Sequence, residues 1–408
     1  MAGPLSDIRV LDLSRQLAGP WTAQMLGDLG AEVIKVERPK VGDEVRSFGP
    51  PFIKDKDGNE TREAPFFFGG NRNKKSITID LGHPDGQDLL RKLAAQSDVV
   101  IENYKVGTLA RYGLGYKHLC AVRPEVIYCS VTGFGQTGPF RDQPGYDSIF
   151  QAMGGLMSIN GYPDGEPGAG PMRVGIAVAD IMTGMYSSIA ILGALHHRER
   201  TGEGQHIDMA LFDVQVASLT IENLRYLLIG EVPKPTGNVS RNLVPTQLFT
   251  CSDGRKISMT IGNDEQFTRF CKLVGRPELA EDPQYKTGAA RRANRTKLIP
   301  IVDAIFLKKG AMEWVDLLGS AGVPIGRVNY INEVFENPQV VERQMKIELE
   351  HERLGTVSMV ANPIKYSKTA LEYRMAPPML GQHTHDVLSG LLGLSEDEIR
   401  CLAERGAI

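Results

Sequence analysis

Apolar and polar positions follow two alternating patterns along the first 135 residues. Short, almost continuous apolar runs predict five strands, at residues 8–13, 32–37, 76–80, 98–103 and 125–131. Apolar residues at helical spacing predict helices over 19–29 and 85–96, and Pro20 fits the first turn of the earlier one. Strands that alternate with helices are typical of a parallel sheet covered by helices. The sequence therefore predicts an α/β fold with a doubly wound sheet.

The pattern changes between residues 131 and 184, where twelve of 54 residues are glycine. Glycine-rich segments predict loops, and loops on a rigid sheet commonly carry function. A long helix over 180–198 and a strand over 206–211 are expected to follow. The apolar run 181–197 is shorter than the ~20 residues that span a bilayer, so we expect a buried helix.

The second half of the chain has the pattern of a smaller α+β domain. Residues 248–260 predict a hairpin that turns at Asp253-Gly254. Helices are expected in three places, at residues 264–273, 292–306 and 312–318. The stretch 230–242 is the best linker candidate, and extended chain over 357–381 leads to a last helix at 395–404.

Composition narrows the classes of partner. The chain has 408 residues, enough for more than one domain at a typical ~150 residues each. It has 46 basic and 49 acidic residues, a net charge of −3, without a long run of one sign. Nucleic acid and anionic membranes are therefore not expected as partners.

Five widely spaced cysteines, without a CxxC motif, predict a reducing compartment. No histidine lies at a metal-ligand spacing from them, so no metal site is expected. The first residues lack a basic stretch followed by an apolar one, which indicates no secretory signal. The expected localisation is cytoplasmic.

Asp180 is the only acidic residue between Glu166 and Glu199, at the junction of the glycine-rich segment with the apolar helix. An aspartate at a helix N-cap accepts backbone N–H bonds and is kept ionised by the helix dipole. The same position suits a carboxylate nucleophile that forms a covalent acyl intermediate. Spacing leaves both interpretations open.

A second set of candidates lies where loops follow strands: Arg38, residues 71–75, Asn103-Tyr104 and Arg111. Ligands of open α/β sheets bind at the carboxyl ends of strands, and basic groups there suit phosphates. Ordinary solvated surface charge explains the same residues equally well. Because GxGxxG and GxxxxGK[ST] are absent, NAD and P-loop chemistry are not expected. The GxSxG elbow of serine hydrolases is absent too.

Several long blocks stand out along almost the whole chain. They include LAGPWTAQMLGDLGAEVIKVERP from residue 18, NRNKKSITIDL from 71 and ADIMTGMYSSIAILGAL from 179. Further blocks lie at residues 42–46, 100–116, 126–139, 145–161, 244–249, 322–329, 363–369 and 376–384. In this order, the blocks resemble the class III CoA-transferase family, which includes formyl-CoA and carnitine CoA-transferases.

The resemblance implies that Asp180 is the catalytic nucleophile. An acyl-CoA and a small carboxylic acid would be the partners, CoA serving as substrate and not as a tightly bound cofactor. The acyl group would first form an anhydride with Asp180 and CoA would then form a thioester with it, without ATP. The family's CoA-binding positions correspond to Leu17, Ala18, Arg38, Asn71, Arg72, Asn73, Asn103, Arg111, Thr132 and Phe134.

Within the family, the resemblance implies succinyl-CoA as donor and a C4 to C6 dicarboxylate as acceptor. Arg15, Arg46 and Arg72 lie near the expected loops and suit a second carboxylate, although surface placement of each stays equally open. Tyr146 and Gly262 are further substrate candidates. Gly262 corresponds to the family's glycine-rich lid, but this chain has one glycine there, which leaves the lid role open.

Two alternatives stay open. The first is an α-methylacyl-CoA racemase of the same fold. Those racemases carry a histidine base where this chain has Tyr146, between Gly145 and Asp147. Tyrosine, with a pKa near 10, is a poor base, which favours the transferase. A non-catalytic CoA-binding protein would need Arg38 and Asn103 but not Asp180.

The resemblance also implies an architecture. A large Rossmann-like domain would be built from both termini, at residues 1–225 and 336–408, with a small α+β domain at 226–335 inserted between them. Two such chains would interlock as a homodimer.

Overall fold

The computed structural model describes residues 3–408. Its largest sheet has six parallel strands. Its strands, in spatial order, are β3 (Lys74–Thr78), β2 (Glu32–Glu37), β1 (Arg9–Asp12), β4 (Val99–Glu102), β5 (Ile127–Thr132) and β6 (Gln205–Ala210). All neighbouring pairs are parallel. The predicted α/β fold with a parallel sheet is confirmed.

The strand order reverses its direction beside β1. The chain runs outward from β1 through β2 to β3, then returns to the other side of β1 and continues through β4, β5 and β6. The loops that leave β1 and β4 therefore diverge at the carboxyl edge. In open α/β sheets this divergence forms the crevice in which ligands bind.

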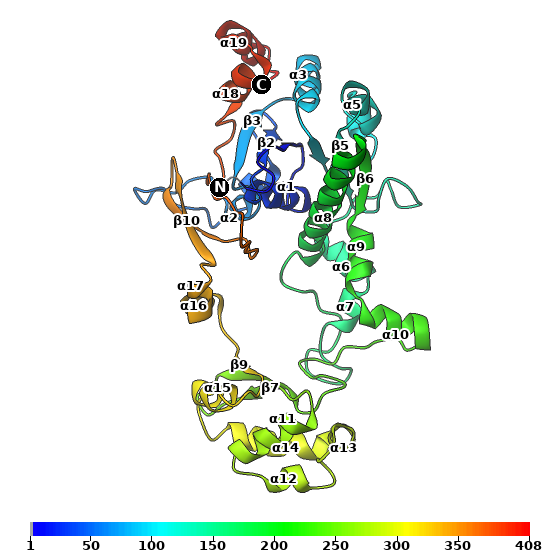
Figure 1. Ribbon diagram of the computed structural model, residues 1–408, viewed down its shortest axis with the longest axis vertical. Coiled ribbons are helices and arrows are strands. Elements are labelled where there is room, and N and C mark those ends of the chain that lie inside the picture. Colours follow the sequence, from blue (N-terminus) through cyan, green and yellow to red (C-terminus); the bar gives the residue numbers. More distant parts are fainter. Residues whose placement is uncertain (1–2) are drawn as a thin grey trace. The chain divides into compact units, whose positions relative to one another are not determined.

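Two layers of helices cover the sheet (Figure 1). Helices α1 (Ala18–Asp28) and α8 (Val178–Thr201) bury Leu26 and Ile191 against one face. The other face is covered by α3 (Pro84–Ala95), α5 (Tyr116–Val122), α18 (Thr384–Leu392) and α19 (Glu396–Glu404). Helix α18 lies next to β3, where Thr384 Oγ1 accepts the Thr78 N–H at 3.0 Å, so the two ends of the chain share one core.

Helix α8 is longer at both ends than the predicted 180–198. Its 24 residues make it, within residues 3–408, the one helix long and apolar enough by length and composition to cross a membrane, so the expectation that it falls short was wrong. A core helix meets the same criterion. Gly184 lies in its packed side, where an added Cβ would come within 2.9 Å of the Ala18 carbonyl oxygen, so glycine permits the close contact with α1.

The chain divides into two compact units. The larger is Met1–Leu156, Val174–Glu231 and Val341–Ile408, and the smaller is Met157–Arg173 and Val232–Val340. The expected boundaries, 225 and 335, fall a few residues earlier, and residues 1 and 2 lie outside the described part. Residues 157–173, expected in the large domain, belong to the smaller unit, where Gly161 accepts the Gly237 N–H at 2.8 Å.

The smaller unit contains the predicted hairpin, formed by β7 (Thr246–Thr250) and β8 (Lys256–Thr260). A three-residue strand, β9 (Ile325–Arg327), extends it and is too short to be recognised from its pattern. The expected helix 292–306 is divided at Asn294 into α13 (Gly288–Ala293) and α14 (Arg295–Phe306). With α11 (Asp264–Leu273) and α15 (Ala311–Gly319) these elements enclose a core that includes Phe267, Phe306 and Trp314.

The extended return expected at 357–381 begins in a second hairpin, β10 (Lys346–His351) and β11 (Gly355–Val360), in the larger unit.

The remaining short elements are η1 (Glu44–Ser47), α2 (Pro65–Gly69), α4 (Thr108–Arg111), α6 (Asp147–Met153), α7 (Leu156–Ile159), α9 (Leu211–Ser218), α10 (Ile221–Ile229), α12 (Glu278–Glu281), α16 (Ile331–Glu336) and α17 (Pro338–Glu342). The five cysteines are free. The cytoplasmic localisation stays a prediction.

Candidate active site

A pocket of about 340 Å³ opens at the carboxyl edge of the parallel sheet, where the strand order reverses. It is built within the larger unit, from the loops after β1, β4 and β5 and from the first turns of α1 and α8. Six residues selected from the sequence line it together: Arg15, Ala18, Asn103, Thr132, Tyr146 and Asp180.

Arg15 and Asn103 join the two diverging loops. The Asn103 Oδ1 accepts the Arg15 backbone N–H at 2.9 Å, and its Nδ2 donates to the Arg15 carbonyl at 2.7 Å. The Arg15 guanidinium lies over the Tyr104 ring, 4.6 Å from its centroid, and its Nη1 donates to Glu44 at 2.5 Å. Its Nε is buried without a partner, which leaves one donor of this cation unused at the pocket.

Asp180 is the third residue of α8 and not its N-cap, because the helix begins at Val178. The capping acceptor is Asp147, at the start of α6, whose Oδ1 accepts the Ala179 N–H at 2.8 Å. The structural interpretation of Asp180 as a cap was therefore wrong. Its half-buried carboxyl group lines the pocket instead.

The protonation of Asp180 also differs from the expectation that it stays ionised. Burial and, as a smaller cause, the negative charge of Asp147 together raise the pKa of Asp180 to about 7, while a hydrogen bond from the Ala18 backbone opposes the shift. Desolvation and like charge disfavour the carboxylate more than the helix ends favour it. A carboxyl group of this kind is close to half ionised at neutral pH.

Packing between α1 and α8 brings the Ala18 N–H to Asp180. Thr22 Oγ1, one turn into α1, bonds to the Ala18 carbonyl at 2.9 Å and reaches the Gly184 carbonyl of α8 at 3.3 Å. The N-terminal ends of two helices thus converge on one carboxyl group. Such ends carry partial positive charge and unpaired N–H groups that favour anions.

Arg46 and Arg72 lie away from this pocket, and the structure does not support substrate contacts by their side chains. Arg46 donates to both oxygens of Glu37, at 2.7 and 2.8 Å. Arg72 does the same to Asp28, at 2.8 and 2.5 Å. Both guanidinium groups are buried and neutralised by these partners, which no local sequence pattern reveals.

The neighbouring amides are also committed to the fold. Asn71 donates to the Phe67 carbonyl at 2.8 Å, and Asn73 donates to Asp28 at 2.9 Å. Both side chains are buried and neither lines the pocket. These bonds hold both side chains in the fold, and a contact of Asn71 or Asn73 with CoA stays a prediction.

The other predicted residues are accessible but not part of the pocket. Arg38 and Arg111 are exposed, and Leu17 and Phe134 are half-buried. Gly262 is exposed in the smaller unit, directly before α11. Their roles in binding stay predictions.

The sequence analysis named Tyr104 beside Asn103 without giving it a role, and it did not select Lys105 and Arg141, which also line the pocket, or Asp147, which lies outside the lining. Tyr104 and Lys105 directly follow Asn103, so the end of β4 was the available signal. Arg141 lies in the Gly-Pro-rich segment 138–145, where an isolated arginine on a loop was a usable signal. Asp147 was noted only as part of the Gly-Tyr-Asp turn.

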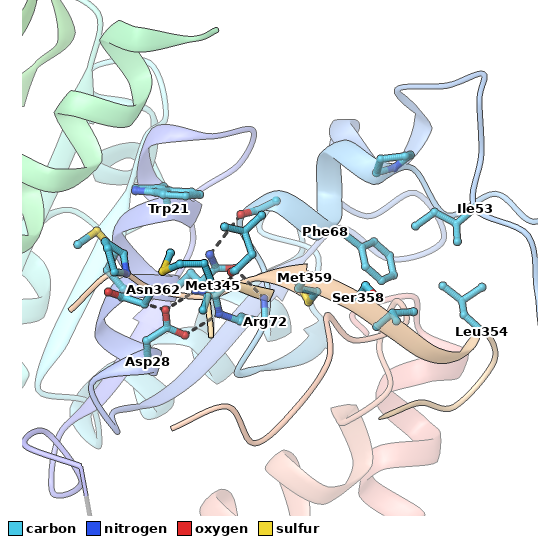
Figure 2. A pocket seen from close by; sticks show the side chains of 18 of the residues that line it. Trp21, Asp28, Ile53, Phe68, Arg72, Met345, Leu354, Ser358, Met359 and Asn362 are labelled. Carbon is cyan, nitrogen blue, oxygen red and sulfur yellow. Dashed lines mark hydrogen bonds and ion pairs between the residues drawn. The ribbon is translucent and has the colours of Figure 1, made fainter. Parts of the chain in front are cut away.

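A second, larger cavity of about 970 Å³ lies along α1 within the larger unit, lined by Trp21 and Asp28 of that helix (Figure 2). Trp21, Phe68, Met345, Leu354 and Met359 line it and make it mainly apolar. At its polar end, Asp28 is bonded by Arg72 and by Asn362, the latter at 3.1 Å. Because these charges satisfy one another, the cavity suits an apolar surface better than a phosphate group.

Comparison with known proteins identifies the family of this chain. A model of the family described as CoA-transferase family III matches residues 5–384. The chain is 47% identical over 388 residues to the succinate–glutarate CoA-transferase of Agrobacterium fabrum, covering 95% of this chain and 96% of that protein. It is 40% identical over 405 residues to the human succinyl-CoA:glutarate CoA-transferase, covering 99% and 90%.

Among solved structures, a CAIB/BAIF family protein from Brucella suis superposes with a TM-score of 0.86 at 43% identity. The match covers 96% of this chain and all of that one.

Proposed function

This chain belongs to CoA-transferase family III, and from that membership we propose that it moves CoA from succinyl-CoA to a dicarboxylic acid through covalent intermediates on Asp180. The relatives named above are succinate–glutarate enzymes, which supports these substrates. One observation carries the proposal: the Asp180 carboxyl group and the Arg15 guanidinium line the same pocket, at the edge of the sheet where the strand order reverses.

The proposed reaction begins when an oxygen of Asp180 attacks the thioester carbon of succinyl-CoA. The C–S bond breaks, CoA leaves as a thiolate, and Asp180 carries a succinyl anhydride. The thiolate then attacks the side-chain carbonyl carbon of Asp180, which releases succinate and leaves CoA bound as a thioester.

The acceptor carboxylate next attacks the same carbon and expels the thiolate. An anhydride between Asp180 and the acceptor results. Attack of the thiolate on the acceptor carbonyl releases the new acyl-CoA and restores the Asp180 carboxylate. One thioester is exchanged for another, so the cycle needs neither ATP nor a net proton transfer.

Convergence of two helix ends supports this chemistry. Each attack places negative charge on a carbonyl oxygen, and backbone N–H donors near a developing oxyanion lower that barrier. The Ala18 N–H bonds to Asp180 and is such a donor. We propose that Asn103, Thr132, Arg38 and Arg111 serve the CoA side of the site.

We propose that Arg15 binds the second carboxylate of the acid, since it presents a buried, unpartnered Nε at the pocket. Arg15→Gln is expected to raise KM for glutarate at least tenfold, because a charge-assisted bond is lost. The same variant is expected to change KM for acetate little. Equal effects on both acids would contradict a role in recognising the second carboxylate.

Trapping of the intermediate tests the proposed function most directly. Enzyme mixed with succinyl-CoA and quenched with hydroxylamine is expected to give an Asp180 hydroxamate, read by mass spectrometry of the peptide. Asp180→Ala is expected to lose the adduct and at least about 10³-fold in rate. Exchange of the substrate's α-proton with solvent, without transfer, would instead support the racemase.

We also propose a homodimer. Helix α10 has no buried residue, and Leu227, Leu228 and Ile229 are each more than 70% exposed. Ile189 of α8 is 64% exposed, and Met185, Tyr186 and Leu192 of the same helix are exposed as well. Apolar exposure on this scale marks a surface that a partner covers.

Analytical ultracentrifugation is expected to show a dimer for the native chain. Leu228→Asp with Ile189→Asp is expected to weaken it, whereas Val122→Asp, at an exposed apolar site on α5, is the matched control. A native chain that sediments as a monomer at micromolar concentration would overturn the dimer.

A further inference from the structure

Asp147 lies outside the pocket lining, but its side chain is hydrogen-bonded to the helix that carries Asp180. Its Oδ1 accepts the Ala179 N–H at 2.8 Å, and its Oδ2 accepts Gln151 Nε2 at 2.6 Å. The buried Gln151 in turn accepts the Val174 N–H at 2.9 Å. Both oxygens of Asp147 are therefore committed to holding the first turn of α8 and the segment before it.

We propose that Asp147 is a positioning residue for the nucleophile: it anchors the turn that carries Asp180, and its negative charge favours the acylated state of Asp180 over the free carboxylate. This rests on the proposed function of Asp180. Asp147 itself contacts no substrate atom in this role.

The charge argument depends on which groups face Asp180. The cations that line the pocket are Arg15, Lys105 and Arg141, and Asp142 is the second acid. Arg15 is paired with Glu44, and Arg141 with Asp142 at 3.4 Å. Tyr104 and Tyr146 complete the titratable groups of the lining.

Among residues 3–408, the groups that bond to Asp147 are neutral donors, the Ala179 N–H and Gln151 Nε2. Its charge is therefore not offset by a direct ion pair, and the pKa of Asp180 is raised by it. Repulsion between two carboxylates disappears once Asp180 becomes an anhydride or a thioester, since neither carries a charge on that side chain. The covalent enzyme is thereby stabilised relative to the free one.

Two variants separate the charge from the anchor. Asp147→Asn keeps Oδ1 as an acceptor for the Ala179 N–H and removes the charge, together with the Oδ2 acceptor of Gln151 Nε2, whereas Asp147→Ala removes the charge and both acceptors. Asp213→Asn is the matched control, since Asp213 is an exposed acid in the first turn of α9 that does not line the pocket.

The experiment follows adduct formation from succinyl-CoA between pH 5 and 9, together with the acylated fraction at equilibrium at pH 8. Asp147→Asn is expected to move the midpoint of the rate profile to lower pH by about one unit and to reduce the ratio of acylated to free enzyme about tenfold. Asp147→Ala is expected to show both effects and, in addition, to lower the plateau rate at least tenfold. Asp213→Asn is expected to match the native enzyme.

If Asp147→Asn has the same midpoint of the rate profile and the same acylated fraction as the native enzyme, the charge role is overturned. If Asp147→Ala has the native plateau rate, the anchoring role is overturned. If Asp147→Ala does not fold, a lower acylated fraction in Asp147→Asn still decides the charge role. Failure of the proposed function is distinguishable, because the native enzyme itself would then give no adduct at Asp180.

Discussion

The amide side chain of Asn103 bonds to both backbone polar groups of Arg15, accepting the N–H at 2.9 Å and donating to the carbonyl at 2.7 Å. One side chain thus closes the gap between the loops that leave β1 and β4. These loops diverge because the strand order reverses there, so no ladder of backbone hydrogen bonds can join them. The shape of the pocket depends on this link.

Asn103→Ala is expected to raise KM for succinyl-CoA about 10- to 100-fold, since it leaves both Arg15 backbone groups without partners and lets the two loops separate. Asn103→Asp keeps the acceptor and loses the donor, so an intermediate KM is expected. Steady-state kinetics with thermal unfolding as a control measure both. A KM unchanged in the alanine variant would contradict the link.

Asp180 is expected to make the protein less stable as the pH rises. Its pKa in the folded protein, about 7, lies above the ordinary aspartate value of 3.8, so the folded state binds more protons between these values. Stability from this group is complete below about pH 4 and is lost as the pH rises through 7.

Asp180→Asn removes that dependence. Relative to the native chain, the variant is expected to gain about 1 to 2 kcal/mol in free energy of unfolding between pH 5 and pH 8, after allowance for solvent screening at a half-buried site. Urea unfolding at the two pH values measures the difference. Parallel pH curves for both proteins would show that Asp180 has an ordinary pKa.

Gly184→Ala is expected to impair activity through the packing of α8 on α1. The added Cβ would lie 2.9 Å from the Ala18 carbonyl oxygen and from Trp21 Cδ1, so the helices must separate and Asp180 moves from the Ala18 N–H. We expect kcat to fall at least tenfold, with a loss of about 1 to 3 kcal/mol in stability.

Gly390→Ala is the control, an exposed glycine within helix α18 where an added Cβ meets nothing within 4 Å. Alanine is the better helix former, so this variant is expected to be fully active and more stable by about 0.5 to 1 kcal/mol. Kinetics and urea unfolding of both variants are the measurement. Equal behaviour of the two would contradict a specific packing role for Gly184.

Arg72→Ala and Arg38→Ala are expected to act on different properties. Removing Arg72 leaves Asp28 buried without its charged partner, which costs about 3 to 5 kcal/mol in stability. Arg38 is exposed, so its loss is expected to leave stability within about 0.5 kcal/mol while raising KM for succinyl-CoA. Unfolding and kinetics of the pair test the division, and a stable Arg72→Ala chain with only a raised KM would reverse it.

The sequence alone predicted the parallel sheet and the hairpin of the smaller unit, because alternating apolar runs and a turn at Asp253-Gly254 are local signals. Extended similarity also pointed to the family. Local signals failed at the 157–173 segment, whose placement depends on a contact of Gly161 with the distant Gly237.

The tertiary structure decided which candidates form a site. From the sequence, Arg15, Arg46 and Arg72 are equivalent candidates. Arg46 and Arg72 are buried and paired with Glu37 and Asp28, whereas Arg15, paired with Glu44, is partly exposed and lines the pocket.

It also decided the state of Asp180. A pattern identifies an acid ahead of an apolar helix, but its pKa depends on burial and on Asp147, 33 residues earlier in the chain. Charge and desolvation act through space, so residues distant in sequence determine them.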